Sequence, residues 1–205
     1  MKSPLINIKQ IKQHHKQLDC GVACIMMVLS HYDKECPIRD EIWEHISGHT
    51  RNRDMNCKTY KMGAFLEECG LLTSIIKYSN LDALLTYCEE NQIPAIFNIH
   101  SFDNENFGHY VIFIRYNNSR IILCDPGYNN GRRSIRIEEL EKKFIKNDEN
   151  DEIGGNIVII CSENMSEGTG YLCKVCNREN ILHNDLKDKS IGFVCKFCDE
   201  LNHFE

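Results

Sequence analysis

The sequence predicts an α+β fold class, with helices in the first half of the chain and a mostly antiparallel sheet in the second half. Two observations predict this layout: an all-apolar run follows Gly21, and short β-branched and aromatic runs follow Pro94. A third observation, the paired spacing of four cysteines near the end of the chain, predicts a small additional unit there.

The helical half begins at Asp19, a residue type that commonly caps helix N-termini. Because the eight residues after Gly21 are all apolar, we expect a helix that is buried on every side at the centre of the domain. Amphipathic helices are expected at three further places, residues 39–46, 60–69 and 80–90.

The second half is expected to contain strands at residues 95–99, 109–116, 120–124 and 156–161, and one helix at 138–145. Residues 163–170 are polar and contain Gly and Ser, which is typical of a linker. The chain therefore divides into a domain of residues 1–162, a linker of residues 163–170 and a C-terminal unit of residues 171–205. No internal repeat is recognised.

The composition is that of an ordinary globular protein. Among 205 residues, 42% are hydrophobic and 26% are charged, so a core can form without disulfides. The net charge is −6, and the densest basic group, Arg132, Arg133 and Arg136, is small. Since phosphate binding needs a concentrated basic surface, nucleic acid is not expected as a partner.

No segment has the apolar length of a signal peptide or a membrane helix. We therefore expect a cytoplasmic protein without a membrane partner. In a reducing compartment its 12 cysteines should be thiols, metal ligands or catalytic groups rather than disulfides.

Cys20 is singled out by its place at the start of the buried helix, next to a glycine that permits close approach by another backbone. The positive end of the helix dipole favours the thiolate form of such a cysteine. Free cysteines are also common core residues, and Cys24, one turn further on, is assigned to core packing. Position alone leaves both interpretations of Cys20 open.

His109 and Asp125 are the residues that would make Cys20 a nucleophile, since a thiol nucleophile needs a base and a group that orients it. His109 opens one predicted strand and Asp125 follows the next. With a three-residue connecting loop, Asp125 would share a face with His109. With a two-residue loop, the two would lie on opposite faces.

Together, the motifs Asp-Cys-Gly-x-Ala-Cys at 19–24, Gly-His-Tyr-Val at 108–111 and Asp-Pro at 125–126 resemble the double-glycine leader peptidase family, over about residues 10–162. They also resemble guanylyl cyclase domain-containing proteins. The first resemblance implies a papain-like fold and a cysteine peptidase with Cys20 as nucleophile, His109 as base and Asp125 as orienting acid. It further implies a peptide substrate with small residues, such as Gly-Gly, before the cleaved bond.

One position departs from that family. The glutamine that would stabilise an oxyanion is expected six residues before the nucleophile, where this chain has His14. Gln13 is favoured for that role, through a longer approach loop, and Gln17 is the alternative. Either glutamine could equally be an exposed loop residue.

The pairs Cys173-x-x-Cys176 and Cys195-x-x-Cys198, separated by 18 residues, predict a zinc ribbon. Four thiolates leave no open coordination position, so the zinc would be structural. His183 and His203 are not needed as ligands. The ribbon would fold residues 171–205 and present a surface to a protein partner or substrate. A redox role for the two pairs is the competing interpretation.

Three other functions are weighed. A papain-like module without activity could serve only in protein interaction, and the displaced glutamine favours it. A guanylyl cyclase is less well supported, because no phosphate-binding loop or carboxylate pair is found. A transferase would use the same three residues with an amine in place of water. The sequence does not distinguish hydrolase from transferase, and it does not determine the oligomeric state.

Overall fold

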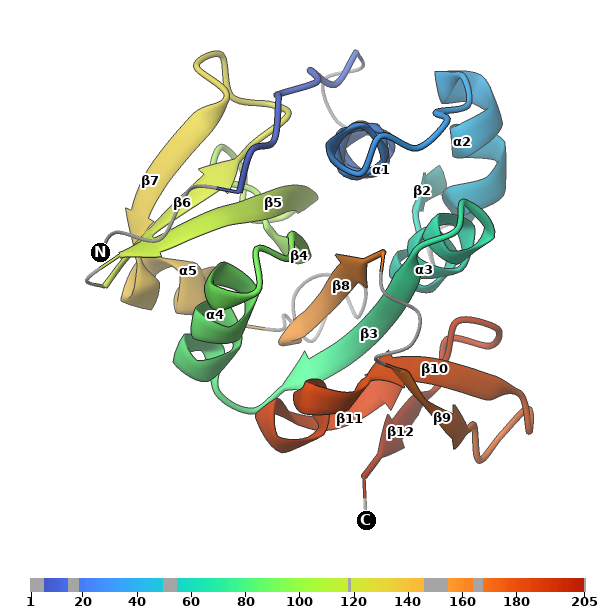
Figure 1. Cartoon of the computed structure of the whole chain (residues 1–205). Coiled ribbons are helices and arrows are strands. Elements are labelled where there is room, and N and C mark those ends of the chain that lie inside the picture. Colours follow the sequence, from blue (N-terminus) through green and yellow to red (C-terminus); the bar gives the residue numbers. More distant parts are fainter. Residues whose placement is uncertain are drawn as a thin grey trace.

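The computed structural model describes residues 6–14, 19–49, 55–117, 119–145, 155–163 and 168–204. Its largest element is a sheet of eight strands in the order β12-β11-β3-β8-β4-β5-β6-β7 (Figure 1), and every neighbouring pair is antiparallel. The α+β fold class is thereby confirmed.

The strands of this sheet are β3 (Leu72–Tyr78), β4 (Ala95–His100), β5 (Gly108–Asn117), β6 (Arg120–Cys124), β7 (Arg132–Arg136), β8 (Ile157–Ser162), β11 (Ser190–Val194) and β12 (Leu201–His203). Two smaller antiparallel pairs join β1 (Ser47–His49) to β2 (Met55–Cys57), and β9 (Gly168–Leu172) to β10 (Glu179–His183).

The helices are α1 (Cys20–His31), α2 (Arg39–Ile46), α3 (Thr59–Glu68), α4 (Leu81–Glu90) and α5 (Ile137–Lys143), with a short 3-10 helix, η2 (Asn184–Lys189). Each α-helix was predicted to within two residues at its start and its end. In Figure 1, α1 and α3 lie on one side of the sheet and α4 lies on the other.

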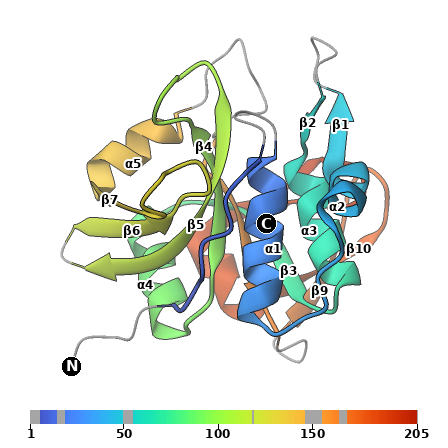
Figure 2. The ribbon, with the colours of Figure 1, turned by 90° about the horizontal axis from the view of Figure 1, so that it is seen from above.

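Helix α1 is buried almost all the way round, as its apolar run predicts. Of its residues, Cys20 to Ile25 and Met27 to Leu29 are all buried. Seen from above, the helix lies between β5 and the pair α2 and α3 (Figure 2). This burial fixes the position of its first residue, because a helix packed on every side cannot shift without breaking core contacts.

Strand β3 was not predicted. Its sequence, LTSIIKY, is buried at six of seven positions and pairs with β8 on one side and β11 on the other. A strand covered on both faces lacks the polar–apolar alternation that identifies half-buried strands. The predicted order of helices first and sheet second is therefore incomplete, since β3 lies between α3 and α4 in the chain.

The C-terminal unit shares this sheet, because its strand β11 pairs directly with β3. Strand β9 begins at Gly168, inside the segment that was predicted to be linker. The two parts of the chain are therefore joined by a hydrogen-bonded ladder as well as by the connecting segment.

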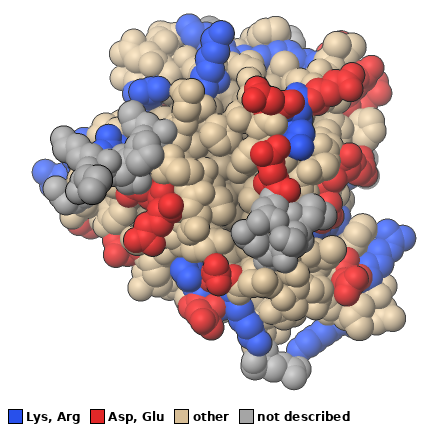
Figure 3. Space-filling view, viewed as in Figure 1, with Lys and Arg blue, Asp and Glu red and all other residues tan. Residues whose placement is uncertain are grey.

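On the face shown in Figure 3, acidic and basic side chains are interspersed and no broad basic surface is seen. Within the described ranges, no helix is both long enough and apolar enough to span a membrane.

Candidate active site and metal centre

Cys20 is the first residue of α1, and it is buried with 5% of its surface exposed. Asp19 stands at the N-cap, and its backbone carbonyl accepts a hydrogen bond from Ala23 N at 3.0 Å. Its carboxylate does not cap the helix, contrary to the expectation from sequence. It binds instead the backbone N–H of His14 at 3.0 Å and the guanidinium of Arg39 at 2.8 Å.

Arg39 ties the approach segment to the start of the helix. Its Nη1 atom donates to Asp19 and its Nη2 atom donates to the carbonyl of Lys12 at 2.6 Å. Because Gln13 follows Lys12 directly, this double contact fixes the path of the chain that brings Gln13 toward the site. Sequence reasoning did not identify Arg39, and no local motif marks it.

Gly21 allows a close approach, as predicted, although by a side chain rather than by a backbone. A Cβ atom at this position would lie 2.8 Å from both Cβ and Sγ of Cys57. Cys24 is fully buried, so its assignment to the core is confirmed.

His109 and Asp125 are brought together by their strands. The Nε2 atom of His109 lies 2.7 Å from Oδ1 of Asp125, and both residues are buried. The sequence left open which connecting loop would allow this. Asn117 pairs with Arg120, so only two residues connect β5 to β6.

A β-bulge corrects the register that this short loop sets. The pairing shifts by one residue between Phe113 and Arg115, so that Ile112 faces Cys124. A bulge adds an extra residue to one strand and moves the following side chains to the other face. The two-residue loop and the bulge together give the arrangement that a three-residue loop would have given alone.

Asp125 is held by three donors. Its Oδ1 atom accepts from His109 and from Gly127 N at 2.9 Å, and its Oδ2 atom accepts from Arg133 Nε at 3.0 Å. Burial alone would raise the pKa of this carboxyl group. The hydrogen bond and charge of His109, with the donors Gly127 and Arg133, outweigh burial and lower the pKa.

The imidazole of His109 has two acidic partners. Burial alone would lower its pKa, but hydrogen bonds to Asp125 and Cys20, and the negative charge of each, raise the pKa to about 10. The ring of His109 therefore interacts with both the thiol and the carboxylate, and its Nε2 atom is the one that faces Asp125.

Gln13 lies beside this group. Its backbone N–H donates to the carbonyl of Pro126 at 3.2 Å. The space in front of Gly127 is bounded by Gln13 Oε1, His109 Cε1 and Asp125 Oδ1, which lie 3.4 to 3.5 Å from the point where a Cβ atom would be. Gln13 Oε1 is buried and has no hydrogen-bond partner among the described residues. His14 is exposed, and Gln17 lies outside the described residues.

The four predicted cysteine ligands also come together. The Sγ atoms of Cys173, Cys176, Cys195 and Cys198 all lie within 4.8 Å of one another. Two of the sulfur–sulfur distances, from Cys173 to Cys198 and from Cys176 to Cys195, are 3.6 Å. Sulfurs bound tetrahedrally to zinc stand ~3.8 Å apart. The cluster therefore fits a four-thiolate metal ion, and none of the 12 cysteines forms a disulfide.

The cysteine cluster is built from an internal repeat that sequence reasoning missed. Residues 170–180, GYLCKVCNREN, align with residues 192–202, GFVCKFCDELN. In both copies the residue after the second cysteine, Asn177 or Asp199, has a positive φ, 57° and 63° respectively. The Cys-Lys-x-Cys units and the asparagine four residues later were a signal that alignment of the segment with itself would have found.

The asparagine of each copy forms hydrogen bonds with the other copy. Asn180 donates to the sulfur of Cys195, and Asn202 donates to the sulfur of Cys173, both at 3.4 Å. Each asparagine also accepts a backbone N–H from the other copy, Lys196 at 2.9 Å and Lys174 at 2.8 Å. N–H donors aimed at sulfur stabilise thiolates and orient them for a metal.

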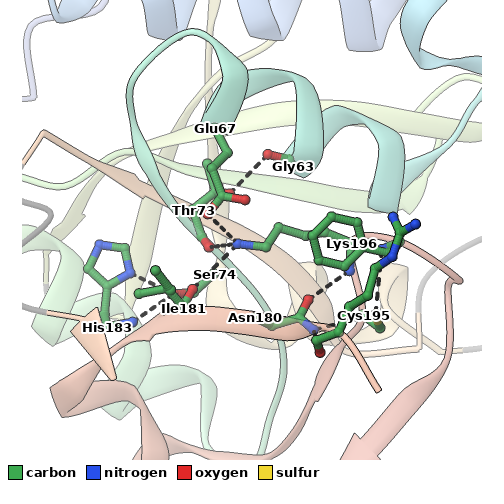
Figure 4. Close-up of polar contacts among 11 residues, drawn as sticks. Gly63, Glu67, Thr73, Ser74, Asn180, Ile181, His183, Cys195 and Lys196 are labelled. Carbon is green, nitrogen blue, oxygen red and sulfur yellow. Dashed lines mark hydrogen bonds and ion pairs between the residues drawn. The ribbon is translucent and has the colours of Figure 1, made fainter. Parts of the chain in front are cut away.

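The seam between this unit and the sheet is polar and buried (Figure 4). Lys196 Nζ donates to Glu67 Oε1 at 2.6 Å and to the carbonyl of Thr73 at 3.1 Å. The ring nitrogens of His183 lie 2.7 Å from Ser74 Oγ and 2.8 Å from Ser162 Oγ. Lys196, which directly follows Cys195 of the cluster, therefore contacts β3 through Thr73.

Comparisons with known proteins identify a family and a shared fold. The profile of the Peptidase C39 family matches residues 8–147. The lactococcin-G-processing and transport ATP-binding protein of Lactococcus lactis is 26% identical over 129 residues, which are 62% of this chain and 17% of that protein. This chain therefore spans less than a fifth of that relative.

Three solved structures share the fold. The peptidase domain of Streptococcus ComA has a TM-score of 0.56 at 18% identity, over 77% of this chain and 100% of that chain. A double glycine motif protease from an AMS/PCAT transporter, in complex with the leader peptide, has a TM-score of 0.51 at 20% identity, over 78% and 92%. A putative C39-like peptidase from Bacillus anthracis has a TM-score of 0.57 at 13% identity, over 80% and 98%.

A buried helix headed by a cysteine, packed on an antiparallel sheet that carries a histidine, gives this chain the papain-like fold that it shares with these structures. The family match covers most of the chain and agrees with this fold. The chain belongs to the Peptidase C39 family.

Proposed function

We propose that the chain cleaves a peptide bond with Cys20 as nucleophile, His109 as general acid and base, and Asp125 as the group that orients the imidazole. The observation that carries the proposal is the 2.7 Å contact of His109 Nε2 with Asp125 Oδ1, together with the interaction of the same ring with Cys20. Such an arrangement holds a proton on the ring while the sulfur is a thiolate.

The proposed reaction is acyl transfer. The thiolate sulfur of Cys20 forms a bond to the substrate carbonyl carbon. The C–N bond then breaks as His109 gives its proton to the leaving amine, which leaves a thioester on Cys20. Water, deprotonated by His109, releases the acid and restores the thiol pair. An amine in place of water would make the enzyme a transferase.

Gln13 is proposed to help stabilise the oxyanion of the tetrahedral intermediate, together with the backbone N–H of Cys20. Its buried Oε1 atom beside His109 and its backbone contact with Pro126 support this role. A buried amide oxygen without a hydrogen-bond partner is uncommon, and because this oxygen is an acceptor, an oxyanion would be bound by the N–H₂ group of the same amide. Since the two ends of an amide can exchange by rotation, its N–H₂ group can face the same space.

The proposed substrate is a peptide with small residues such as Gly-Gly before the cleaved bond. One relative is named for processing lactococcin G, and one solved structure of similar fold is in complex with a leader peptide. Those are properties of those proteins, and they support the proposal for this chain by analogy.

Zinc is proposed to bind Cys173, Cys176, Cys195 and Cys198 in a structural role. The mutual distances of the sulfurs and the amide donors of Asn180 and Asn202 support it. The ion would hold both halves of the repeat together, and thereby hold β11 on β3. A protein partner on the exposed side of this unit, and the guanylyl cyclase resemblance, stay predictions.

The test is alkylation of the native protein with iodoacetamide across pH, with each cysteine mapped by mass spectrometry. Cys20 should react faster at neutral pH than the exposed thiol of Cys36. His109→Ala should remove that advantage, while His45→Ala, which removes an exposed imidazole on α2, should leave it unchanged.

Hydrolysis of a peptide that contains Gly-Gly should be lost in Cys20→Ala and His109→Ala and retained in His45→Ala. If Cys20 reacts no faster than Cys36 and ignores the loss of His109, the thiolate–imidazole pair does not exist. The chain would then be a protein-interaction module that kept the fold of a peptidase.

A further inference from the structure

Arg133 is the one member of the basic group at 132–136 that turns inward. Along β7, Arg132, Ser134 and Arg136 are exposed, Arg133 is half-buried and Ile135 is buried. This is the alternation of a strand with one face on the protein. The side chain of Arg133 therefore points toward the loop that carries Asp125.

The guanidinium of Arg133 is held on three sides. Its Nε atom donates to Asp125 Oδ2 at 3.0 Å. Its Cζ atom lies 4.0 Å from the centre of the Phe102 ring and 4.2 Å from the centre of the Tyr128 ring. A planar cation between two aromatic faces is stabilised by cation–π attraction and cannot easily rotate.

The two rings come from different segments. Phe102 lies in the connection between β4 and β5, just before the strand that carries His109, and Tyr128 lies in the loop that follows Asp125. The backbone of this loop is fixed as well, since Gln10 Nε2 donates to the carbonyls of Asp125 and Tyr128 at 2.9 and 2.8 Å. Arg133 thus contacts both the segment that precedes the strand of His109 and the loop that carries Asp125.

From these contacts we propose that Arg133 is a positioning residue for the proposed reaction: it fixes the rotation of the Asp125 carboxylate, so that Oδ1 faces His109. The inference rests on the proposed function. Arg133 touches neither the thiol nor the imidazole in the described contacts, and it acts through Asp125.

A lysine could not replace it fully. Its ammonium is a point charge without a flat face, so it would keep the positive charge near Asp125 and lose the fit between the two rings. Arg133→Lys therefore separates the effect of charge from the effect of fixed orientation. Arg136→Gln removes an exposed arginine of the same strand and is the matched control.

The experiment measures kcat/KM and the alkylation rate of Cys20 across pH in Arg133→Gln, Arg133→Lys, Arg136→Gln and Asp125→Asn. Arg133→Gln should lower kcat/KM ~10-fold or more, the value of a lost charge-assisted hydrogen bond. The acidic limb of its profile should move to higher pH, because Asp125 loses a neighbouring cation. Arg133→Lys should restore the position of that limb but not the full rate.

Two results would overturn the inference. If Arg133→Gln lowers only the melting temperature and the pH profile keeps its position, Arg133 is structural. If Arg133→Lys and Arg133→Gln behave alike at every pH, neither the charge nor the orientation matters as proposed. Asp125→Asn distinguishes failure of the proposed function from failure of this inference. If Asp125→Asn keeps full activity, the proposed function is wrong. If Asp125→Asn is inactive and Arg133→Gln behaves like the wild type, only the role of Arg133 is refuted.

Discussion

His109 Nε2, on β5, and Asp125 Oδ1, directly after β6, lie 2.7 Å apart although the two residues are 16 positions apart in the chain. The pair is buried, and Asp125 takes two further donors. A carboxylate held in this way is fixed as an anion beside the ring, so the ring can be protonated at neutral pH.

Asp125→Asn should lower kcat/KM about 100-fold or more, because the amide neither orients the ring nor stabilises its positive charge. The pKa of His109 should fall, which an NMR titration of the ring would detect. Asp103→Asn is the control, since it makes the same chemical change at an exposed position between β4 and β5. Equal activity of the two variants would contradict a role for Asp125.

The pH dependence should reflect the pKa of His109, which is raised to about 10. A raised folded-state pKa means that the stabilisation from protonated His109 is complete below the ordinary value and is lost as pH rises through about 10. General-acid activity should decline over the same range. A ring that titrates near the ordinary value in the wild type, by NMR, would show that the pair with Asp125 and Cys20 is not formed.

Loss of the metal should loosen the peptidase sheet as well as the C-terminal unit. Cys195→Ser should remove bound zinc, measured by elemental analysis, and lower the free energy of unfolding by about 3 kcal/mol or more. Backbone amides of β3 should exchange faster with solvent, because β11 pairs with that strand. Cys36→Ser, at an exposed cysteine, is the control. Unchanged protection of β3 would mean that the metal stabilises only its own unit.

The internal repeat provides a matched pair of lysines. Lys196→Met removes a buried ammonium that binds Glu67 and Thr73, and should cost about 2 kcal/mol of unfolding free energy. Lys174→Met changes the equivalent, exposed lysine of the other copy and should cost less than about 0.5 kcal/mol. Chemical denaturation of the zinc-loaded proteins measures both. Equal costs would refute the seam as a stabilising contact.

The seam should also weaken in acid. Burial lowers the pKa of His183 to about 4, and the charge of Lys196 contributes. A lowered pKa means that stability is complete above the ordinary value near 6.5 and is lost as pH falls toward 4, by up to about 3 kcal/mol. His183→Gln should have lower stability at neutral pH and a flatter dependence between these values. Denaturation curves across this range test it, and equal slopes would contradict it.

The sequence by itself determined the fold class and the helices, and it singled out Cys20, His109, Asp125 and the paired cysteines as candidate site residues. These are local signals, since an apolar run, a residue that begins or ends an element, and a Cys-x-x-Cys spacing are all read within one segment. The repeat at 170–180 and 192–202 was equally readable, and it was missed.

Only the tertiary structure decided how these residues meet. The bulge after Phe113 places His109 and Asp125 on one face, and no residue pattern in that strand predicts the bulge. Arg133 contacts Asp125 while two aromatic rings from other segments pack on its guanidinium, and no signal within β7 predicts these contacts. Strand β3 joined the peptidase sheet to the C-terminal unit because both of its edges are paired. Register and long-range pairing depend on the contacts between segments, so they are fixed only when the whole core packs.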